Sequence, residues 1–332
     1  VRPFGGLLAA AWVIIASEAS SRLDVIDLPT GFFPEGITNG EGWTAFVGSL
    51  MNGNIWKGDL ETGQGEVFEL AAPGPTVGLD HDHRPGYLSV AGGQLGTARV
   101  YDEDFALVAD LVLSEGNSSF VDDVIITKTA AFFTDSDFFF FQQDLTLVGP
   151  QVNLDTETGA LLDGSVVQTL VLSDNVPVLD GAFNVNGIEA TDDGSALIMV
   201  NMQSQQLFAV DPDSGDATLI DLGGELLPGE GGDGLVRESM CFWLAKVQDW
   251  GDVFPQRVQV VSLATDLTCR SVAPRALSNP LFDSQTTAMR KGNSLYAVNV
   301  KVGVAVEDIA TTAYAIVRAV RDSGELACLR LQ

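Results

Sequence analysis

Hydrophobic and polar positions between Asn184 and Gly224 alternate in short runs that are typical of β-strands. The runs GIEAT, ALIMVN, QLFAVD and ATLIDL are apolar or alternate over lengths that suit strands rather than helices. They are separated by DDGS and DPDSG, in which Gly tolerates a positive φ and Pro presets the first corner of a turn. One four-stranded module cannot bury both of its faces, so the pattern predicts neighbouring copies.

Five further segments repeat this order of strands and turns. With the first residue of each module's first strand as reference, the copies begin at Glu35, Val77, Asp122, Asn186, Asp233 and Thr287. The intervals between them are 42, 45, 64, 47 and 54 residues, close to the roughly 40 to 50 residues of a β-propeller blade. The long third interval, from Asp122 to Asn186, contains an insertion around Val152 to Val176, which we interpret as an extended loop.

The repeat predicts an all-β fold, a six-bladed β-propeller with a central channel. A run LDVIDLP precedes the first copy and a run GELACLRLQ follows the last, so strands from both termini are expected to share a blade and close the ring. Residues 20–332 would form this single domain. Two separate β-domains are the alternative, but the sequence contains no linker between them.

The first 19 residues have the layout of a secretory signal peptide, with one Arg, an apolar stretch and small residues near Ala16 to Ala19. An outer strand is the alternative for this segment. We therefore expect a secreted, extracellular protein. Three cysteines allow at most one internal disulfide, for which Cys241 with Cys269 is the favoured pair, although free thiols remain an open alternative.

The charge of the chain excludes one class of partner. Asp and Glu number 45 against 17 Lys and Arg, a formal net charge of −28, so nucleic acid is not expected as a ligand. The acidity favours cations, and much of it is accounted for by a solvated surface. No later segment is apolar over the roughly 20 residues that a membrane span needs. A small-molecule substrate and a monomeric chain are the expectation.

The reference position of the repeat carries the candidate chemistry. The first strand of each blade lines the channel, so Glu35, Asp122, Asn186 and Asp233 are expected to converge on the axis. Singly, each could cap a turn or bind backbone amides. Together, four oxygen donors without His or Cys form a site for a hard cation such as Ca²⁺, which would offset the cost of gathering buried carboxylates.

Four short motifs around these residues resemble the metal-site motifs of the senescence-marker-protein-30, gluconolactonase and luciferin-regenerating-enzyme family. They are PEGI at Pro34–Ile37, VDDV at Val121–Val124, VNGI at Val185–Ile188 and GDGL at Gly232–Leu235, and the resemblance runs from about Phe32 to Asn299. It implies a six-bladed propeller with a channel Ca²⁺ that hydrolyses lactones or, in one branch, organophosphates. Asp122 departs from the family, whose members usually carry Asn there.

The resemblance implies metal-assisted hydrolysis of a lactone or related ester. Glu35, Asp122, Asn186 and Asp233 would hold the metal, and Asp233 is the first candidate for general base or nucleophile, with Glu35 the second catalytic carboxylate. A non-catalytic propeller in which Ca²⁺ is structural is the alternative function. The acidic Asp122 makes activity a weaker expectation than binding.

Further residues are assigned to the pocket from their place beside the reference position. Asp122, Gln285, Thr287 and Gly93 are expected to contact substrate. The pair His81 and His83 lies beyond the inner position of the second copy, in a predicted turn, and is expected on the surface.

Overall fold

The computed structural model describes residues 22–70, 74–114, 119–136, 148–162, 167–179, 182–222, 232–238, 241–245, 258–264, 266–267, 269–272, 277, 279–292 and 294–320. Within these residues the secondary structure is β, apart from one short 3-10 helix, η1 (Ile309–Thr311). No helix in this part of the chain is long and apolar enough to cross a membrane. The predicted signal segment, residues 1–19, lies outside the described residues.

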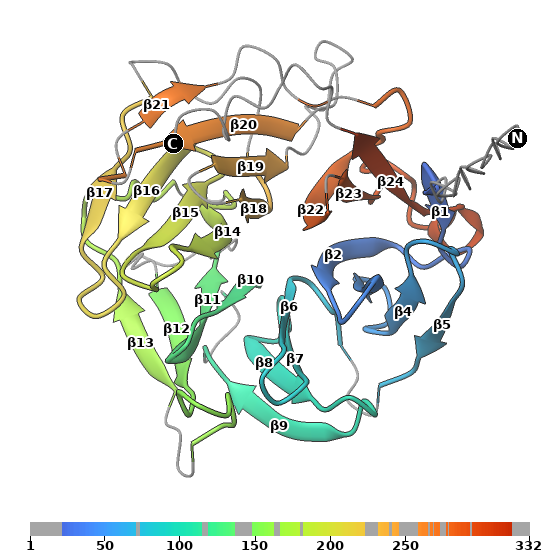
Figure 1. The fold of residues 1–332 in the computed structure, drawn as a ribbon, viewed down its shortest axis with the longest axis horizontal. Helices are drawn as coiled ribbons and strands as arrows, with labels where there is room; N and C mark the ends of the chain where they lie inside the picture. The colour runs from blue at the N-terminus through green and yellow to red at the C-terminus, as the bar shows by residue number, and fades with distance from the viewer. Residues whose placement is uncertain are drawn as a thin grey trace, which may run out of the picture.

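Four-stranded antiparallel sheets surround a common axis (Figure 1). Five of them follow the chain in order, with strands β2 (Pro34–Asn39), β3 (Thr44–Ser49), β4 (Ile55–Asp59) and β5 (Gly65–Phe68); β6 (Leu79–Asp82), β7 (Tyr87–Ala91), β8 (Thr97–Tyr101) and β9 (Leu107–Val112); β10 (Val121–Ile126), β11 (Ala130–Asp135), β12 (Val148–Asn153) and β13 (Gln168–Val171); β14 (Val185–Ala190), β15 (Leu197–Asn201), β16 (Gln206–Val210) and β17 (Ala217–Leu219); and β18 (Leu235–Glu238), β19 (Cys241–Ala245), β20 (Val258–Leu263) and β21 (Cys269–Val272). A sixth sheet has the order β1 (Val25–Asp27), β24 (Ala315–Val320), β23 (Ser294–Asn299) and β22 (Gln285–Lys291). The prediction of an all-β propeller is confirmed.

The first strand of each sheet lies next to the axis. β2 contacts β6, and contacts of the same kind continue through β10, β14, β18 and β22 back to β2. In the sixth sheet β1 pairs with β24 through Val25↔Val317, Ile26↔Ile316 and Asp27↔Ala315. This sheet therefore combines a strand from before the first repeat with three strands from the last one.

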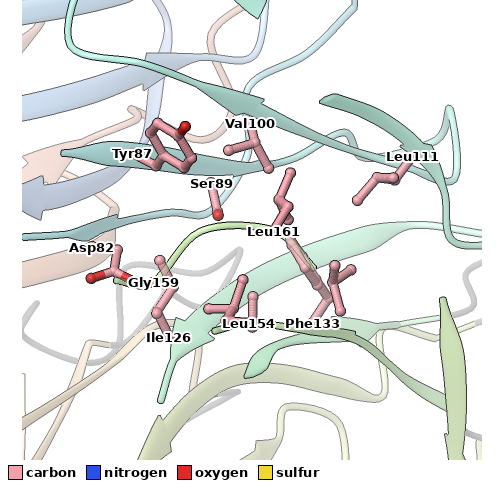
Figure 2. Close-up of a pocket in the computed structure, with 12 residues that line it drawn as sticks. Asp82, Tyr87, Ser89, Val100, Leu111, Ile126, Phe133, Leu154, Gly159 and Leu161 are labelled. Carbon is pink, nitrogen blue, oxygen red and sulfur yellow. The ribbon is translucent and has the colours of Figure 1, made fainter. Parts of the chain in front are cut away.

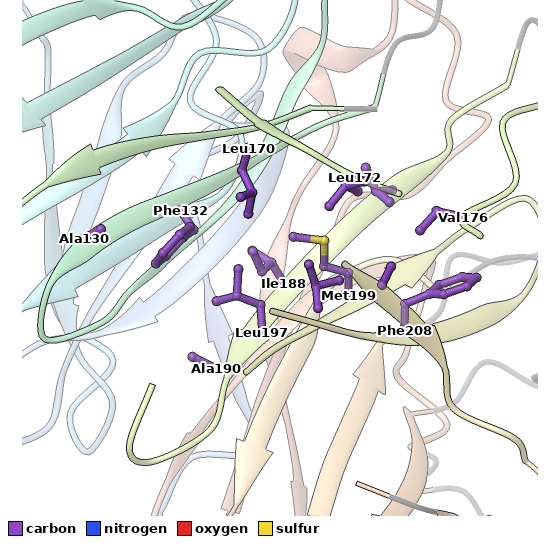
Figure 3. Packing of buried hydrophobic residues seen from close by; sticks show 13 residues of the cluster. Ala130, Phe132, Leu170, Leu172, Val176, Ile188, Ala190, Leu197, Met199 and Phe208 are labelled. Atoms are coloured by element: carbon purple, nitrogen blue, oxygen red, sulfur yellow. The ribbon is translucent and has the colours of Figure 1, made fainter. Parts of the chain in front are cut away.

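Hydrophobic side chains fill the spaces between neighbouring sheets. Figure 3 shows one such cluster, in which Phe132 of β11 packs toward Ile188, Leu197 and Met199 of the next sheet, with Phe208 behind them. Each of these side chains is almost fully buried, and burial of one such side chain contributes about 1.5–3 kcal/mol. Because the faces are buried only against neighbours, the sheets depend on one another around the ring.

A polar side chain at the end of the second strand fixes the loop that enters the inner strand. The bonds are Phe120 N–H to Asp135 Oδ1 at 2.8 Å, Asn201 Nδ2 to Pro177 O at 2.8 Å and Asn299 Nδ2 to Leu281 O at 2.8 Å. Since these loops lead directly into the inner strands, the bonds also fix where each inner strand begins.

Two sequence-based expectations are wrong. The segment from Val152 to Val176 is not only a loop, because it contains the end of β12 and the outer strand β13. The favoured pair Cys241 and Cys269 lies on β19 and β21, with β20 between them. Two strand spacings of about 4.8 Å separate their Cα atoms by more than the roughly 7 Å that a disulfide spans.

Candidate functional site

The candidate site is built on a β-bulge that recurs in the inner strands. In β2, Pro34 pairs with Ser49 and Ile37 with Val47, so two residues of the inner strand face one residue of its neighbour. β10, β14 and β22 show the same shift in their first pairings. The paired bulge residues are Glu35–Gly36, Asp122–Asp123, Asn186–Gly187 and Thr286–Thr287. A bulge leaves its extra residue outside the ladder and re-aims its side chain.

Backbone bonds between adjacent sheets align this position around the axis. Gly78 N–H donates to Asp122 O at 2.7 Å, Gly187 N–H to Asp233 O at 3.1 Å and Gly234 N–H to Thr286 O at 2.9 Å. These bonds place Val77 and Asp233 at the reference position in the second and fifth sheets.

The aligned ring is Glu35, Val77, Asp122, Asn186, Asp233 and Thr286. Thr287, which the repeat placed at this position, is wrong by one residue, because it is the second residue of its bulge. Its Oγ1 lies where a Cβ on Gly234 would be, so it packs against the neighbouring sheet. Thr286 Oγ1 instead donates to Glu35 O at 2.7 Å and joins the sixth sheet to the first.

The four predicted metal-binding side chains are all buried. Glu35 is 9% exposed, Asn186 6%, and Asp122 and Asp233 5% each. Within the described part of the chain, no donor forms a hydrogen bond with the carboxylate of Glu35 or Asp233. Two carboxylates without donors near the axis are costly in free energy unless a proton or a cation neutralises them.

Asp122 differs from the other two carboxylates because its side chain has a hydrogen-bond partner. Ser136 Oγ, directly after β11, bonds Asp122 Oδ2 and also donates to Val185 O at 2.7 Å. A hydroxyl has one proton, so a protonated Asp122 donating to Ser136 Oγ accounts for both contacts. Asp135 is the last residue of β11, and Ser136 follows it directly.

The electrostatics show that these carboxylates converge. Burial, and then the charges of Asp233, Asp122 and Asp123, raise the pKa of Glu35 well above its ordinary value. Burial, followed by Asp122 and Asp123, likewise raises the pKa of Asp233. Burial raises the pKa of Asp122 to about 8, against the opposing bond from Ser136. Within the described residues, the charges that act on these three groups are other carboxylates, so ionisation of one disfavours ionisation of the next.

The donor set suits a hard cation in its chemistry. Three carboxylates and the amide of Asn186 offer oxygen ligands, and no His or Cys is among them. Their spacing is wider than a coordination sphere, because among the described residues no three His, Cys, Asp or Glu side chains lie close enough to share one ion. The repulsion between ionised carboxylates keeps these side chains apart. A bound cation would offset this repulsion and draw the side chains together.

A second layer of carboxylates, which the sequence reasoning missed, serves the backbone instead. The inner strand is a sheet edge, so its channel-side N–H groups have no strand to pair with. They donate to carboxylates of the preceding sheet: Ile126 N–H to Asp80 Oδ2 at 2.9 Å, Ile188 N–H to Asp123 Oδ2 at 3.2 Å and Arg237 N–H to Glu189 Oε1 at 3.0 Å. A carboxylate within each of these inner strands, further along than the reference position, was the available signal.

The remaining predicted pocket residues have structural contacts. Gln285 is fully buried at the start of β22. Gly93 has a φ of +57° and exchanges backbone bonds of 3.0 and 3.1 Å with Val121, which ties the second sheet to the third. Their contact with substrate stays a prediction. His81 lies near the far end of β6 and its Nδ1 is 3.2 Å from Nδ1 of the exposed His83, away from the bulges.

A small cavity between the second and third sheets is separate from this site. It has a volume of about 10 Å³, room for about one water molecule. Figure 2 shows Tyr87 and Val100 on one side of it and Phe133, Leu154 and Leu161 on the other. None of the predicted site residues lines it, so it is a gap in inter-sheet packing.

Comparison with known proteins supports the fold. No protein-family model matches the chain, and no curated protein matches it either. Among solved structures, it is similar to a regucalcin from Agrobacterium tumefaciens, described as a calcium-binding protein, with a TM-score of 0.58 and 16% identity over 90% of this chain and 94% of that one.

The chain is similar to two further solved structures at comparable TM-scores. A gluconolactonase from Xanthomonas campestris has a TM-score of 0.56 and 17% identity over 96% and 99% of the two chains, and a luciferin-regenerating enzyme has 0.57 and 12% over 92% and 94%. These are the proteins whose family the sequence motifs resemble. At such identities the likeness is one of fold.

Proposed function

We propose that this protein is a calcium-dependent hydrolase that opens a lactone or a related ester. The observation that carries the proposal is the ring of buried oxygen donors at one register of four inner strands, whose three carboxylates disfavour one another's ionised form and have no cation acting on them within the described residues. The similarity to a calcium-binding regucalcin and to a gluconolactonase supports the same reading.

Glu35, Asp122, Asn186 and Asp233 would hold the ion. Their backbone positions are fixed by neighbouring sheets: Thr286 Oγ1 bonds Glu35 O, and Thr134 Oγ1 donates to Asn186 O at 2.6 Å. With the backbone held in this way, the four side chains can rotate toward the axis and bind the ion without moving the strands. When bound, Ca²⁺ would polarise the substrate carbonyl and make it more electrophilic.

The catalytic work of the chain itself falls to Asp233. Its carboxylate takes no hydrogen bond within the described residues, so it can accept one from a water molecule and orient that water for attack. Burial, and then the charges of Asp122 and Asp123, raise its pKa above the ordinary value, which makes its carboxylate a stronger base than an exposed one. Glu35, with the same surroundings, is the second carboxylate able to accept the proton.

The apolar face beside the ring suits the body of an ester. Phe33 directly precedes β2, two residues before Glu35, and Phe120 holds the equivalent place before β10, where its ring centroid lies 5.5 Å from that of Phe183. All three are half-buried.

The extracellular location and the monomeric state are part of the proposal and rest on residues 1–19 and on composition.

The test is hydrolysis of a panel of aldonolactones and aryl esters, with calcium ions and with chelator. Glu35→Gln and Asp233→Asn should each lower kcat/KM by about 100-fold or more, while the fold by circular dichroism is kept. Asp213→Asn, the same change at an exposed turn carboxylate, is the matched control and should leave the rate unchanged. Equal rates for all four proteins would contradict the proposal.

A second function, a propeller that binds calcium without catalysis, is favoured by Asp122. With a third carboxylate, the ring binds a cation more strongly. The added negative charge also makes the cation a weaker Lewis acid, so it polarises the substrate carbonyl less. Calcium binding by calorimetry, lost in Glu35→Gln, together with no turnover on the whole panel would select this function.

A further inference from the structure

A second concave site lies at the opposite end of the sheets from the carboxylate ring. β2 begins beside Glu35, and Glu41 follows its far end, about 20 Å along the strand. There a pocket of about 250 Å³ opens between the first and second sheets, lined among others by Phe46, Lys57, His81 and Phe105. We name it the aromatic pocket. Its volume is somewhat below the roughly 300–1,000 Å³ of ordinary ligand sites, which suits a small molecule.

Aromatic rings from separate elements form its wall. Phe105 stacks on Phe68 with ring centroids 4.1 Å apart and 25° between planes, and it meets Phe46 edge-on at 6.1 Å and 72°. The ring of His81 lies 5.3 Å from that of Phe46. Burial, and then the charge of His83, lower the pKa of His81 to about 4, so this ring is neutral at pH 7.

Phe105 is held there at a conformational cost. Its φ is +60°, a region that bulky residues rarely adopt. The turn that imposes it is closed by Asp102 Oδ1, which accepts the N–H groups of Asp104 and Ala106 at 3.0 and 2.9 Å. Such backbone strain often marks a ligand site, and here it places a ring face over the cavity.

The pocket already stabilises one cation. The ammonium group of Lys57 lies 5.7 Å from the ring centroid of Phe46 and 5.6 Å from that of Phe105, within cation–π range of both. Glu41, Asp102 and Glu103 also line the cavity, so three carboxylates face one ammonium. This balance disfavours anionic ligands and favours a second positive charge.

We propose that the aromatic pocket binds a small organic cation, a protonated primary amine carried on an apolar group, whose ammonium replaces that of Lys57 over the Phe46 and Phe105 rings. Lys57 has a flexible stem and pairs across the strands with the exposed Glu66, so its ammonium can move outward to that carboxylate. The ligand's ammonium then takes the cation–π contacts that Lys57 leaves, close to the carboxylates that line the cavity, and its apolar group packs beside the rings. This site does not depend on the hydrolase proposal.

The test measures binding of 2-phenylethylamine by calorimetry to the full chain, beside its neutral analogue 2-phenylethanol and the anion 3-phenylpropionate. The amine should bind at least about fivefold more tightly than either analogue. Lys57→Met removes the competing ammonium and should tighten amine binding about two- to fivefold, without effect on the alcohol. Phe105→Leu should weaken it by a similar factor. Lys128→Met, which removes an exposed lysine elsewhere, should change nothing.

The Lys57 variant decides between the readings. The proposal is overturned if Lys57→Met weakens amine binding. It is likewise overturned if the anion binds best to wild type and loses affinity in Lys57→Met, because the pocket is then an anion site. It is also overturned if none of the three compounds binds a folded wild-type protein, or if the alcohol binds as tightly as the amine. Loss of lactone hydrolysis in Asp233→Asn leaves amine binding intact, so failure of one proposal is distinguishable from failure of the other.

Discussion

Asp122→Asn is the substitution that tests the electrostatics of the carboxylate ring most directly. Asn has the shape of a protonated Asp, and its amide can donate to Ser136 Oγ as a protonated Asp122 would. The change therefore removes a titratable group and keeps the packing. Asn is also the residue that members of the family resembled by the sequence motifs usually carry at this position.

The magnitude follows from the pKa of Asp122. In the unfolded chain an Asp ionises near pH 4, whereas burial raises the pKa of Asp122 to about 8 in the folded protein. Between these values the folded state holds a proton that the unfolded state has lost, so the free energy of unfolding falls as pH rises, by up to about 1.4 kcal/mol per pH unit. At pH 7 this amounts to about 4 kcal/mol as an upper limit.

The assay is urea denaturation in chelator between about pH 4 and about pH 8. Asp122→Asn should equal wild type near pH 4 and become more stable than wild type as pH rises, by a few kcal/mol at pH 7. Calcium ions should stabilise wild type more than the variant, because the ionised carboxylate is then a ligand. A stability difference that does not change with pH, as expected for the control Asp213→Asn, would refute the reasoning.

Two further substitutions test contacts around the ring. Ser136→Ala leaves the buried carbonyl of Val185 without its donor and should lower the free energy of unfolding by about 1–3 kcal/mol in chemical denaturation; an unchanged midpoint would show that this bond contributes nothing. Gly187→Ala places a methyl group against the backbone oxygen of Asp233 and should cost about 1–3 kcal/mol and weaken calcium affinity in calorimetry; an affinity equal to wild type would mean that the ring position does not depend on this close approach.

The strands and their turns could be predicted from the sequence because both are local. Runs such as ALIMVN and QLFAVD, separated by DPDSG, correspond to β15 and β16 with the turn after them. Repetition of that local pattern then predicted an all-β ring, since no module could bury its faces alone. The same reasoning about unpaired edges predicted a blade shared by the two ends of the chain, and β1 of the run LDVIDLP pairs with β24, whereas the run GELACLRLQ lies outside the described residues.

The register of the site could not be read to the last residue, because it depends on the bulges. A bulge adds a residue to one strand only, and nothing in QTTAMRK shows whether Thr286 or Thr287 is the first of the pair. The favoured cysteine pair was wrong for a related reason. Two residues of one sheet can be near in sequence while another strand lies between them, as β20 does between Cys241 and Cys269.

The second layer was missed because its role is to complete the backbone. Asp80 and Glu189 look like ordinary polar residues in a strand, and only the neighbouring sheet shows that each accepts an N–H group from an inner strand. The aromatic pocket was missed as well, since it joins residues of two modules through packing that has no sequence motif.

The recurring bulge also bears on how such a protein can change over evolutionary time. A residue at the first bulge position stands outside the ladder, so its side chain is not needed to hold the strands together. Glu, Asp, Asn and Thr already occupy this position in four sheets of one chain. The scaffold can therefore exchange one functional group for another by single substitutions without breaking the strand pairing, and new specificities on the axis are within reach of few mutational steps.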